Sequence, residues 1–299
     1  MKVAEENQSL PVIMLTGANG QLGWETQRRA QQLTYSLRAF DRQSMDITDA
    51  AAVDAIVGRL RPQAIINAAA YTAVDRAEEE PELAHAVNRD GAANLARAAR
   101  ECGARLVHVS TDFVFDGAKG SPYLVDDAPA PRCVYGATKL AGEQAVLDVL
   151  TREALIVRAA WVYSSHGGNF VHTMLRLMAS RDALRVVDDQ IGSPTWAGGL
   201  ADCIWRALEA KLTGKYHWTD AGVASWYDFA VAIQEEALTL GLLSREIPIE
   251  PIATGEYPLP ARRPAYSVLD KSAIWQTLGY KAPHWRMSLR AMLKELDRA

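Results

Sequence analysis

Short apolar runs alternate with amphipathic stretches through the first half of the chain. The apolar runs predict strands at residues 11–15, 35–40, 64–70, 105–110 and 154–159. The stretches between them predict helices at residues 21–33, 49–60 and 79–100 and from Tyr135 onward. Strands that alternate with helices in this way are typical of a parallel sheet with helices on both faces. The pattern therefore predicts an α/β fold with a doubly wound parallel sheet.

The alternation becomes less regular after Trp161. Further helices are predicted at residues 169–179, 195–211 and 226–240, further strands at residues 185–188 and 216–218, and terminal helices near Ile274 and Leu289. A proline-punctuated stretch lies at residues 248–264. We expect a sheet domain of residues 10–162 with 195–221, and a smaller C-terminal α+β domain of residues 163–194 with 222–299. The two domains are expected to share a cleft.

Composition limits the classes of protein that this chain can be. Its 299 residues are 49% hydrophobic and 23% charged, which suits a soluble globular protein. The longest apolar runs are far shorter than the roughly 18 residues that a membrane span needs. The net charge is −4, and Lys and Arg do not cluster, so we expect neither a membrane nor a nucleic-acid partner. Residues 1–9 lack an apolar core and are expected to be a loose extension rather than a secretory signal.

Cysteine and histidine spacing gives no indication of a metal site. Cys102, Cys133 and Cys203 show no CxxC pair, which argues against a disulfide framework or a zinc site and favours a reducing, cytoplasmic compartment. The six histidines show no HxxxH or HxxE spacing, so no catalytic metal is expected.

A glycine-rich turn joins the first predicted strand to the first helix. Gly17, Gly20 and Gly23 have the spacing GxxGxxG, with Asn19, Gln21 and Leu22 between them. Glycine lets the backbone approach a pyrophosphate, whose charge is stabilised by the N–H groups at a helix N-terminus. The turn therefore predicts a dinucleotide-binding loop in a Rossmann-like fold, and it makes the sheet domain the dinucleotide-binding domain.

The ends of the next two strands extend this dinucleotide site. Asp41 ends the second strand, where a carboxylate can accept hydrogen bonds from the adenosine ribose, and Arg42 beside it can pair with a 2′-phosphate. These two residues favour different coenzymes, so both NADH and NADPH are expected to serve. Asp46 and Ile47 are expected near the adenine, although Asp46 could equally be a helix cap. The small residues Ala68, Ala69 and Ala70 would leave room for a dinucleotide, or would allow close helix packing.

Candidate catalytic residues follow the fourth strand. Thr111 and Asp112 lie at its carboxyl end, the edge where open α/β sheets bind ligands. Tyr135 and Lys139 are four residues apart and so share one helical face. An ammonium near a phenol lowers the pKa of the phenol, so we expect Tyr135 to be a general acid of lowered pKa. Lys139 is expected to hold both the phenolate and a nicotinamide ribose, and Thr111 to bond the reacting oxygen.

Several stretches together resemble the extended short-chain dehydrogenases and, more narrowly, the dTDP-4-dehydrorhamnose reductase family. The matching stretches, in the family's order, are GANGQLG (17–23), NAAAYTAVD (67–75), STDFVFDG (110–117), YGATK (135–139), RAAWVY (158–163) and DQIGSPT (189–195). They extend over much of the chain, and as a set they are far more specific than any one of them.

The resemblance implies reduction by NAD(P)H of the C4 ketone of dTDP-4-dehydro-L-rhamnose to dTDP-L-rhamnose, for cell-surface polysaccharide synthesis. It implies a catalytic set of Thr111, Tyr135 and Lys139 in a monomer or homodimer. The dinucleotide would be bound by Gly17, Asn19, Gly20, Gln21, Leu22, Asp41, Arg42, Asp46, Ile47, Ala68, Ala69, Ala70, Tyr71, Tyr135 and Lys139. The nucleotide sugar would be bound by Thr111, Asp112, Phe113, Tyr135, Trp161 and Arg263.

Four of these substrate and cofactor positions have an alternative interpretation or depart from the family's usual residue. Arg263 suits a diphosphate because its planar fork can bond two oxygens, but it could equally be solvated. Trp161 could instead be a core residue. Phe113 stands where the family often has tyrosine and Tyr71 where it often has histidine, so fine substrate contacts differ while the reaction class stays the same.

Two alternative functions also fit the sequence. A nucleotide-sugar epimerase or dehydratase shares the scaffold, and a dehydratase would carry an acidic residue beside Thr111, where Asp112 stands. A non-catalytic dinucleotide-binding subunit, like the regulatory subunit of methionine adenosyltransferase, also resembles these reductases. The complete Thr111, Tyr135 and Lys139 set favours an enzyme.

Overall fold

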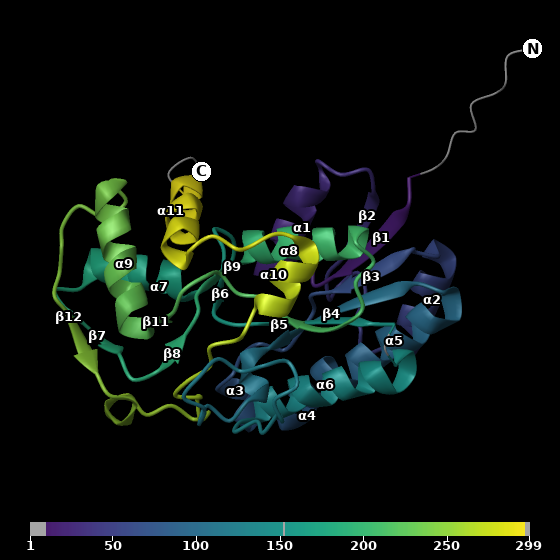
Figure 1. The fold of residues 1–299 in the computed structure, drawn as a ribbon, viewed down its shortest axis with the longest axis horizontal. Helices are drawn as coiled ribbons and strands as arrows, with labels where there is room; N and C mark the ends of the chain where they lie inside the picture. Colours follow the sequence, from purple (N-terminus) through teal and green to yellow (C-terminus); the bar gives the residue numbers. More distant parts are fainter. Residues whose placement is uncertain (1–9, 152, 297–299) are drawn as a thin grey trace, which may run out of the picture.

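Six parallel strands form the central sheet of the computed structural model, which describes residues 10–151 and 153–296 (Figure 1). The strand order is β10-β5-β4-β3-β1-β2. The strands are β1 (Val12–Thr16), β2 (Ser36–Phe40), β3 (Ala64–Asn67), β4 (Arg105–Thr111), β5 (Leu155–Ala159) and β10 (Gly214–His217). The predicted α/β fold with a Rossmann-like parallel sheet is confirmed. The N-terminal extension expected at residues 1–9 lies outside the described residues.

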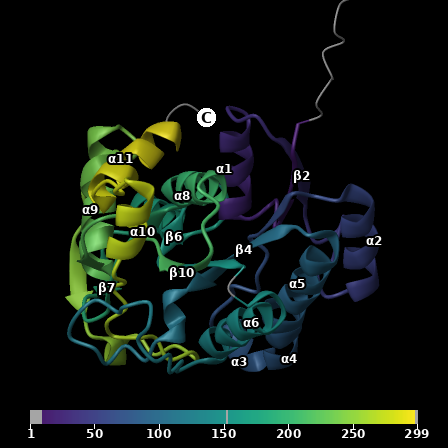
Figure 2. The same ribbon diagram turned by 45° about the vertical axis from the view of Figure 1, so that its right-hand side comes forward.

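Helices cover both faces of this sheet (Figures 1 and 2). Along β1, Ile13 and Leu15 pack toward one face and Met14 toward the other, because successive side chains of a strand alternate. The first face is covered by α1 (Gln21–Ala30), α8 (Ala197–Glu209) and α10 (Ser272–Leu278), and the second by α2 (Ala50–Leu60), α5 (Gly91–Cys102) and α6 (Val134–Leu150).

The strand order places a topological switch point beside β1. From β1 the chain first pairs with β2 on one side, and it then crosses to β3 on the other. In open α/β sheets the crevice at the carboxyl ends of the strands at such a point binds ligands. The glycine turn after β1 and the alanine run after β3 therefore meet at the edge where a ligand is expected.

One predicted helix and one predicted strand differ from the structure. The helix expected at residues 79–100 is broken into α3 (Arg76–Glu79), α4 (Pro81–His85), a π-helical turn η1 (Ala86–Asp90) and α5. Pro81 begins a new helix because proline cannot continue the preceding one. The strand expected at residues 64–70 ends at Asn67, whose side-chain Oδ1 accepts a hydrogen bond from the backbone of Ala69 and turns the chain.

The smaller part of the molecule forms a cap with its own apolar cluster, beside one end of the sheet in Figure 1. Its helices are α7 (Phe170–Ser180), α9 (Trp226–Thr239) and α11 (Trp285–Leu296). Short paired strands accompany them: β6 (Val162–Tyr163) with β9 (Thr195–Trp196), β7 (Leu184–Val187) with β12 (Ile249–Ile252), and β8 (Ile191–Gly192) with β11 (Ala224–Ser225). Single helical turns occur at η2 (Asp112–Val114) and η3 (Thr254–Glu256). The domain boundaries stay a prediction; α10 packs its Ile274 into the core of the sheet.

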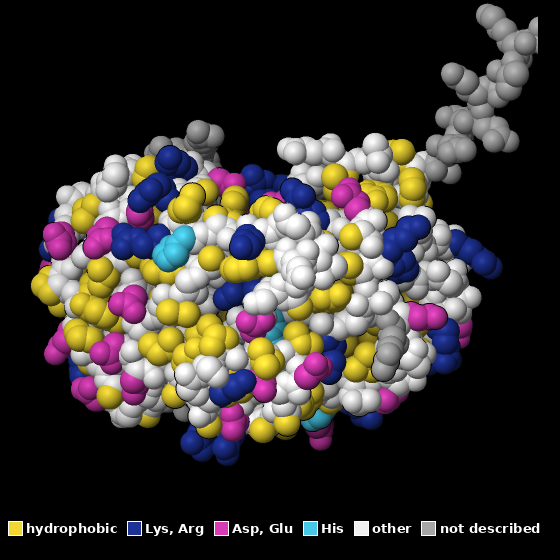
Figure 3. All heavy atoms as spheres, viewed as in Figure 1, with side chains coloured by type: hydrophobic (Ala, Val, Ile, Leu, Met, Phe, Trp, Pro, Cys, Tyr) yellow, Lys and Arg dark blue, Asp and Glu magenta, His cyan; other side chains and the backbone are white. Residues whose placement is uncertain are grey.

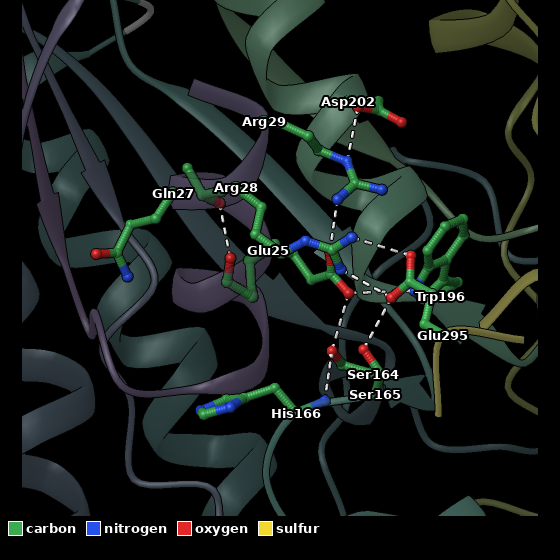
Figure 4. Close-up of polar contacts among 12 residues, drawn as sticks. Glu25, Gln27, Arg28, Arg29, Ser164, Ser165, His166, Trp196, Asp202 and Glu295 are labelled. Carbon is green, nitrogen blue, oxygen red and sulfur yellow. Dashed lines mark hydrogen bonds and ion pairs between the residues drawn. The ribbon is translucent and has the colours of Figure 1, made fainter. Parts of the chain in front are cut away.

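A buried polar cluster joins α1 to the cap (Figure 4). The carboxylate of Glu25, which is fully buried, accepts hydrogen bonds from Arg29, from the Ser164 hydroxyl and from the Trp196 indole. Next to it, Arg28 donates to Glu295 of α11. The helix that begins at the glycine turn is therefore tied to three segments of the cap.

The molecular surface carries both signs of charge. Figure 3 shows Lys and Arg side chains interspersed with Asp and Glu side chains on the face drawn there. Within the described residues, no helix is both long and apolar enough to cross a membrane.

Candidate active site

A cavity of about 970 Å³ runs along the carboxyl edge of the sheet. The ends of β1, β2, β3, β4 and β5 contribute to its walls, together with the first turn of α6 and parts of the cap. All of the site residues predicted from the sequence line it: Gly17, Asn19, Gly20, Gln21, Leu22, Asp41, Arg42, Asp46, Ile47, Ala68, Ala69, Ala70, Tyr71, Thr111, Asp112, Phe113, Tyr135, Lys139, Trp161 and Arg263. Their roles remain proposals, but the structure brings them to one cavity.

The glycine turn is shaped for close approach between backbones. Gly17 has φ 74°, and a Cβ atom there would lie 2.6 Å from the backbone nitrogen of Ala69. A Cβ atom on Gly23 would lie 2.0 Å from the carbonyl oxygen of Gly17. Gly20 is the N-cap of α1, and no side chain caps that helix. The N-terminus of α1 thus faces the cavity as a cradle that suits a phosphate group.

The end of β2 holds a fixed carboxylate. Asp41 accepts a hydrogen bond from the Asn19 side chain at 2.8 Å and bonds Ser44 through both backbone and hydroxyl. These bonds, chiefly those from Ser44, lower the pKa of Asp41. Arg42 is largely exposed and lies 3.6 Å from the Asp46 carboxylate. Both residues thus border the cavity where an adenosine ribose is expected.

The helix-cap alternative for Asp46 is not what the structure shows. Asp46 accepts hydrogen bonds from the backbone and hydroxyl of Thr48, and the N-cap of α2 is Asp49. Ile47 packs against Gly91, where a Cβ atom would lie 2.6 Å from the isoleucine side chain. The segment is therefore fixed by local bonds and by the start of α5.

The alanine run after β3 abuts the glycine turn, since Ala68 and Ala69 are the backbone neighbours of Gly17. The next residue but one, Tyr71, donates its phenol hydrogen to Glu80 at 2.5 Å. Its backbone is held by Asn88, whose amide accepts from the Tyr71 N–H and donates to Thr138 on α6. Asn88 lies in the π-helical turn η1, a geometry that is frequent at functional sites.

The candidate catalytic residues meet where β4 ends and α6 begins. The Thr111 hydroxyl donates to Asp112 Oδ1 at 3.0 Å and accepts from the Phe113 backbone at 3.2 Å. Tyr135 lies in the first turn of α6, with its ring edge-on to Phe113 at a centroid distance of 5.4 Å. Lys139 follows one turn later and is 2% exposed. The helical spacing predicted from the sequence is thus present.

The expected lowering of the Tyr135 pKa is wrong. Loss of surrounding water raises the pKa of its phenol, and the Asp112 carboxylate adds to the rise, against a smaller opposing effect of the Thr111 hydroxyl. In the structure the Nζ atom of Lys139 donates to the carbonyl of Val109 at 2.7 Å. Tyr135 therefore stays protonated, which is the form that a proton donor needs.

Lys139 lies next to a buried network of charged and polar side chains. Burial lowers the pKa of its ammonium to about 8, and the Glu143 carboxylate opposes that shift. Glu143 in turn accepts bonds from Arg158 and from the Ser110 hydroxyl next to Thr111. Arg158 and Glu143 are both almost completely buried. This network fixes the end of β4 relative to α6.

Asp112 is a buried acid beside Thr111. Burial raises its pKa to about 6, and the neighbouring Ser267 and Thr111 hydroxyls partly offset this rise. Its second oxygen, Oδ2, has no hydrogen-bond partner among the described residues. Asp112 also lines the cavity, so this buried carboxyl group lies beside the space that a ligand would occupy.

Arg263 is neither solvated nor free. Its guanidinium forms a two-nitrogen ion pair with Asp75, with distances of 3.0 and 2.7 Å, and it also bonds the carbonyl of Ala261. Asp75 belongs to the loop after β3, so this pair links the sheet to the cap. Arg263 thereby reaches the cavity wall in a fixed orientation.

Other lining residues were missed by the sequence analysis. Trp226, at the start of α9, and Gly168, in the turn before α7, both border the cavity. The Gly-Gly-Asn sequence at residues 167–169 was a signal for a turn, whereas nothing local marked Trp226. Among the described residues there is no cluster of His, Cys, Asp and Glu that could hold a metal ion.

Proteins with a parallel sheet of this kind, a glycine turn after the first strand and a Tyr-xxx-Lys helix beside it form the class of extended short-chain dehydrogenases/reductases, and the chain has the architecture of that class. A UDP-glucose 4-epimerase from Thermus thermophilus, solved with NAD, shares the fold with a TM-score of 0.81 at 19% identity, over 96% of this chain and 99% of its own.

Comparison within the class is more specific. A family profile described as RmlD substrate binding domain matches residues 11–298. A dTDP-4-dehydrorhamnose reductase from Escherichia coli is 42% identical over 95% of this chain and 97% of its own, and one from Streptomyces griseus is 44% identical over 93% and 92%. A Bacillus anthracis dTDP-4-dehydrorhamnose reductase, solved in complex with NADP, has a TM-score of 0.90 at 38% identity over 96% and 99%. The chain belongs to the dTDP-4-dehydrorhamnose reductase family.

Proposed function

We propose that this protein reduces the C4 ketone of dTDP-4-dehydro-L-rhamnose to the hydroxyl of dTDP-L-rhamnose, with NADPH or NADH as reductant. The observation that carries the proposal is the convergence of Thr111, Tyr135 and Lys139 on the cavity that also contains the glycine turn. The relatives named dTDP-4-dehydrorhamnose reductase support the choice of substrate, because they match nearly the whole chain at 42% and 44% identity.

The residues present fit a nicotinamide dinucleotide. Gly17, whose Cβ would strike the neighbouring strand end, keeps the turn tight, and the uncapped N-terminus of α1 supplies N–H groups for the pyrophosphate. Asp41 would accept hydrogen bonds from the adenosine ribose, and Arg42 would face a 2′-phosphate. When bound, the reduced nicotinamide supplies the hydride. We expect both coenzymes to serve, as the two side chains act in opposite directions.

Residues of this chain would supply the proton that the ketone oxygen needs on reduction. Tyr135, kept protonated by its raised pKa, would donate its phenol hydrogen to the ketone oxygen. The Thr111 hydroxyl would donate a second hydrogen bond to that oxygen and so fix its position. The ammonium of Lys139 would stabilise the phenolate as it forms and bond the nicotinamide ribose. Asp112, Phe113, Trp161 and Arg263 would contact the nucleotide sugar from the cap side of the cavity.

The direct test is the absorbance of reduced nicotinamide. Adding dTDP-4-dehydro-L-rhamnose to the protein and NADPH should cause a persistent, stoichiometric loss of absorbance, and a matched reaction without the sugar should not. An epimerase or dehydratase would regenerate its coenzyme and show no net loss, and a binding subunit would show no turnover. Either of these results would overturn the proposal.

We also propose the division into a dinucleotide-binding and a substrate-binding domain, supported by separate apolar clusters around the sheet and among the cap helices. A cytoplasmic location is supported by Cys102, Cys133 and Cys203, which are free thiols. Whether the protein is a monomer or a homodimer stays a prediction.

A further inference from the structure

Two tryptophans form one wall of the cavity. Trp161 follows β5 and Trp226 begins α9, and both line the cavity. Their rings are stacked, with centroids 3.6 Å apart and planes within 5° of each other. One indole comes from the end of the sheet and the other from the cap, so the pair joins the two parts of the molecule at the cavity.

The backbone of Trp161 adopts a conformation that side chains rarely take. Its φ is 48°, in the left-handed region, which is unfavourable for a bulky residue. The backbone N–H of Thr195 donates to the Trp161 carbonyl at 3.1 Å and holds this turn. Such strain persists only where the surroundings determine it, and it is frequent at ligand sites.

Gly192 leaves space for the indole of Trp161. A Cβ atom at this position would lie 2.4 Å from the Cε2 atom of the Trp161 ring, closer than packed atoms come. Gly192 pairs with Ala224 where β8 meets β11, directly before α9. The same short sheet therefore makes room for one indole and positions the helix that carries the other.

Trp226 is held by the cap. Its Nε1 donates to the Gln190 side chain at 3.2 Å, and Gln190 donates onward to Thr254 at 3.0 Å. Phe170 packs against the Trp226 ring at a centroid distance of 4.7 Å. The Trp226 indole is thus fixed by polar and aromatic neighbours, whereas the Trp161 ring depends on Trp226 for its stacking partner.

We propose that Trp226 is a positioning residue: it holds the Trp161 indole in place as the wall against which the sugar ring of the nucleotide-sugar substrate packs. The inference rests on the proposed function, because it assigns the sugar end of the same cavity. Trp226 covers one face of the Trp161 indole, so the C–H groups of the sugar and the apolar methyl group of a 6-deoxy sugar would pack against the remaining surface of that indole. Without Trp226 the Trp161 indole loses its stacking partner and can change its orientation, and contact with the sugar weakens.

Comparing the dissociation constants of dTDP-L-rhamnose and of dTDP separates the contribution of the sugar contact from that of the nucleotide contacts. In Trp226→Leu we expect the dissociation constant for dTDP-L-rhamnose to rise about tenfold, the scale of a lost aromatic pair. The constants for dTDP alone and for NADPH should stay within about twofold. Trp226→Phe keeps an aromatic partner and should show a smaller loss of dTDP-L-rhamnose affinity, which also provides a second variant if the leucine protein fails to fold.

Circular dichroism reports the stack itself. Two indoles at this separation couple and give an exciton couplet in the far ultraviolet, which should disappear in both Trp226 variants and persist in the control Trp275→Phe on α10. If the couplet disappears while dTDP-L-rhamnose affinity is unchanged, Trp226 only packs the cap, and the inference is wrong. If the wild-type protein binds dTDP-L-rhamnose but does not oxidise NADPH, the proposed function fails, and the ratio of dTDP-L-rhamnose to dTDP affinities still decides the role of Trp226.

Discussion

Tyr135 and Lys139 lie one turn apart on α6, but their side chains have different surroundings. The phenol of Tyr135 faces the cavity with a raised pKa, whereas the Lys139 ammonium is bonded to the backbone of β4. Tyr135→Phe should therefore lower kcat by roughly 10² to 10⁴, the range for a positioned acid, and leave NADPH affinity unchanged. Steady-state rates and fluorescence titration measure the two quantities. Tyr35→Phe, which removes a phenol outside the cavity, is the control, and near-normal turnover in Tyr135→Phe would exclude Tyr135 as the proton donor.

The pKa of Lys139 predicts a pH limit. Because that pKa is lowered to about 8, the side chain loses its proton as the pH rises through that value. We expect kcat to fall above pH 8, since the neutral amine no longer stabilises the forming phenolate. Lys139→Arg, whose guanidinium stays charged, should have a lower rate but no fall in this range. A pH profile of the variant that keeps the wild-type limb would contradict this assignment.

The lowered pKa of Lys139 also makes the free energy of unfolding depend on pH. The Lys139 side chain binds its proton less tightly in the folded state than in the unfolded state. Burial of the ammonium therefore lowers the free energy of unfolding, and this cost is fully present below pH 8. This cost decreases as the pH rises from 8 toward the ordinary lysine pKa. Burial of Lys139 is thus a stability cost at neutral pH, which fits a residue kept for function.

Among the elements, the glycine turn between β1 and α1 places the strictest demand on residue type. Gly17→Ala would place a methyl group 2.6 Å from the Ala69 nitrogen at a φ that alanine disfavours. We expect dinucleotide affinity to fall by at least about tenfold. Gly58→Ala is a matched control, because Gly58 is helical with nothing within 4 Å, and it should raise the free energy of unfolding by roughly 0.5–1 kcal/mol. Unaltered NADPH affinity in folded Gly17→Ala would exclude the phosphate-loop role.

The periodicity of the sequence predicted those helices and strands whose formation depends mainly on residues within the element. The sheet strands and α1, α2, α6 and α9 were predicted to within a few residues, because their apolar spacing or caps are local. The π-helical turn η1 was missed because the contact of Asn88 with the Tyr71 backbone joins residues 17 positions apart. Strand β12 was missed because its partner β7 is distant in sequence and it contains Pro251.

In the candidate site, too, the residues that could be predicted are those whose position depends on local sequence. Gly17, Thr111, Tyr135 and Lys139 could be found from motifs, since their spacing is set within one turn or helix. The ion pair of Arg263 with Asp75 joins residues 188 positions apart, and the stack of Trp226 on Trp161 depends on the cap meeting the sheet. No local pattern records such contacts.

At the scale of the whole molecule, buried polar groups hold the cap against the sheet. Glu25 is fully buried and accepts from Arg29, Ser164 and Trp196 (Figure 4). Glu25→Gln removes the buried carboxylate from this cluster, while Asp202 still pairs with Arg29, and should lower the free energy of unfolding by about 1–3 kcal/mol. Urea denaturation measures this. The control Glu235→Gln breaks an exposed pair with Arg286 and should cost less than about 1 kcal/mol. Equal effects of the two changes would contradict a structural role for the buried cluster.

The proposed reaction requires that a hydride reach C4 of the sugar in this cavity. The most direct measurement is the fate of deuterium from NADPH labelled at the transferable position of the nicotinamide, after reaction with dTDP-4-dehydro-L-rhamnose. We expect nuclear magnetic resonance to find one deuterium at C4 of dTDP-L-rhamnose, with one NADPH consumed for each sugar. Deuterium at another carbon, or conversion of the sugar with no deuterium incorporated, would contradict it.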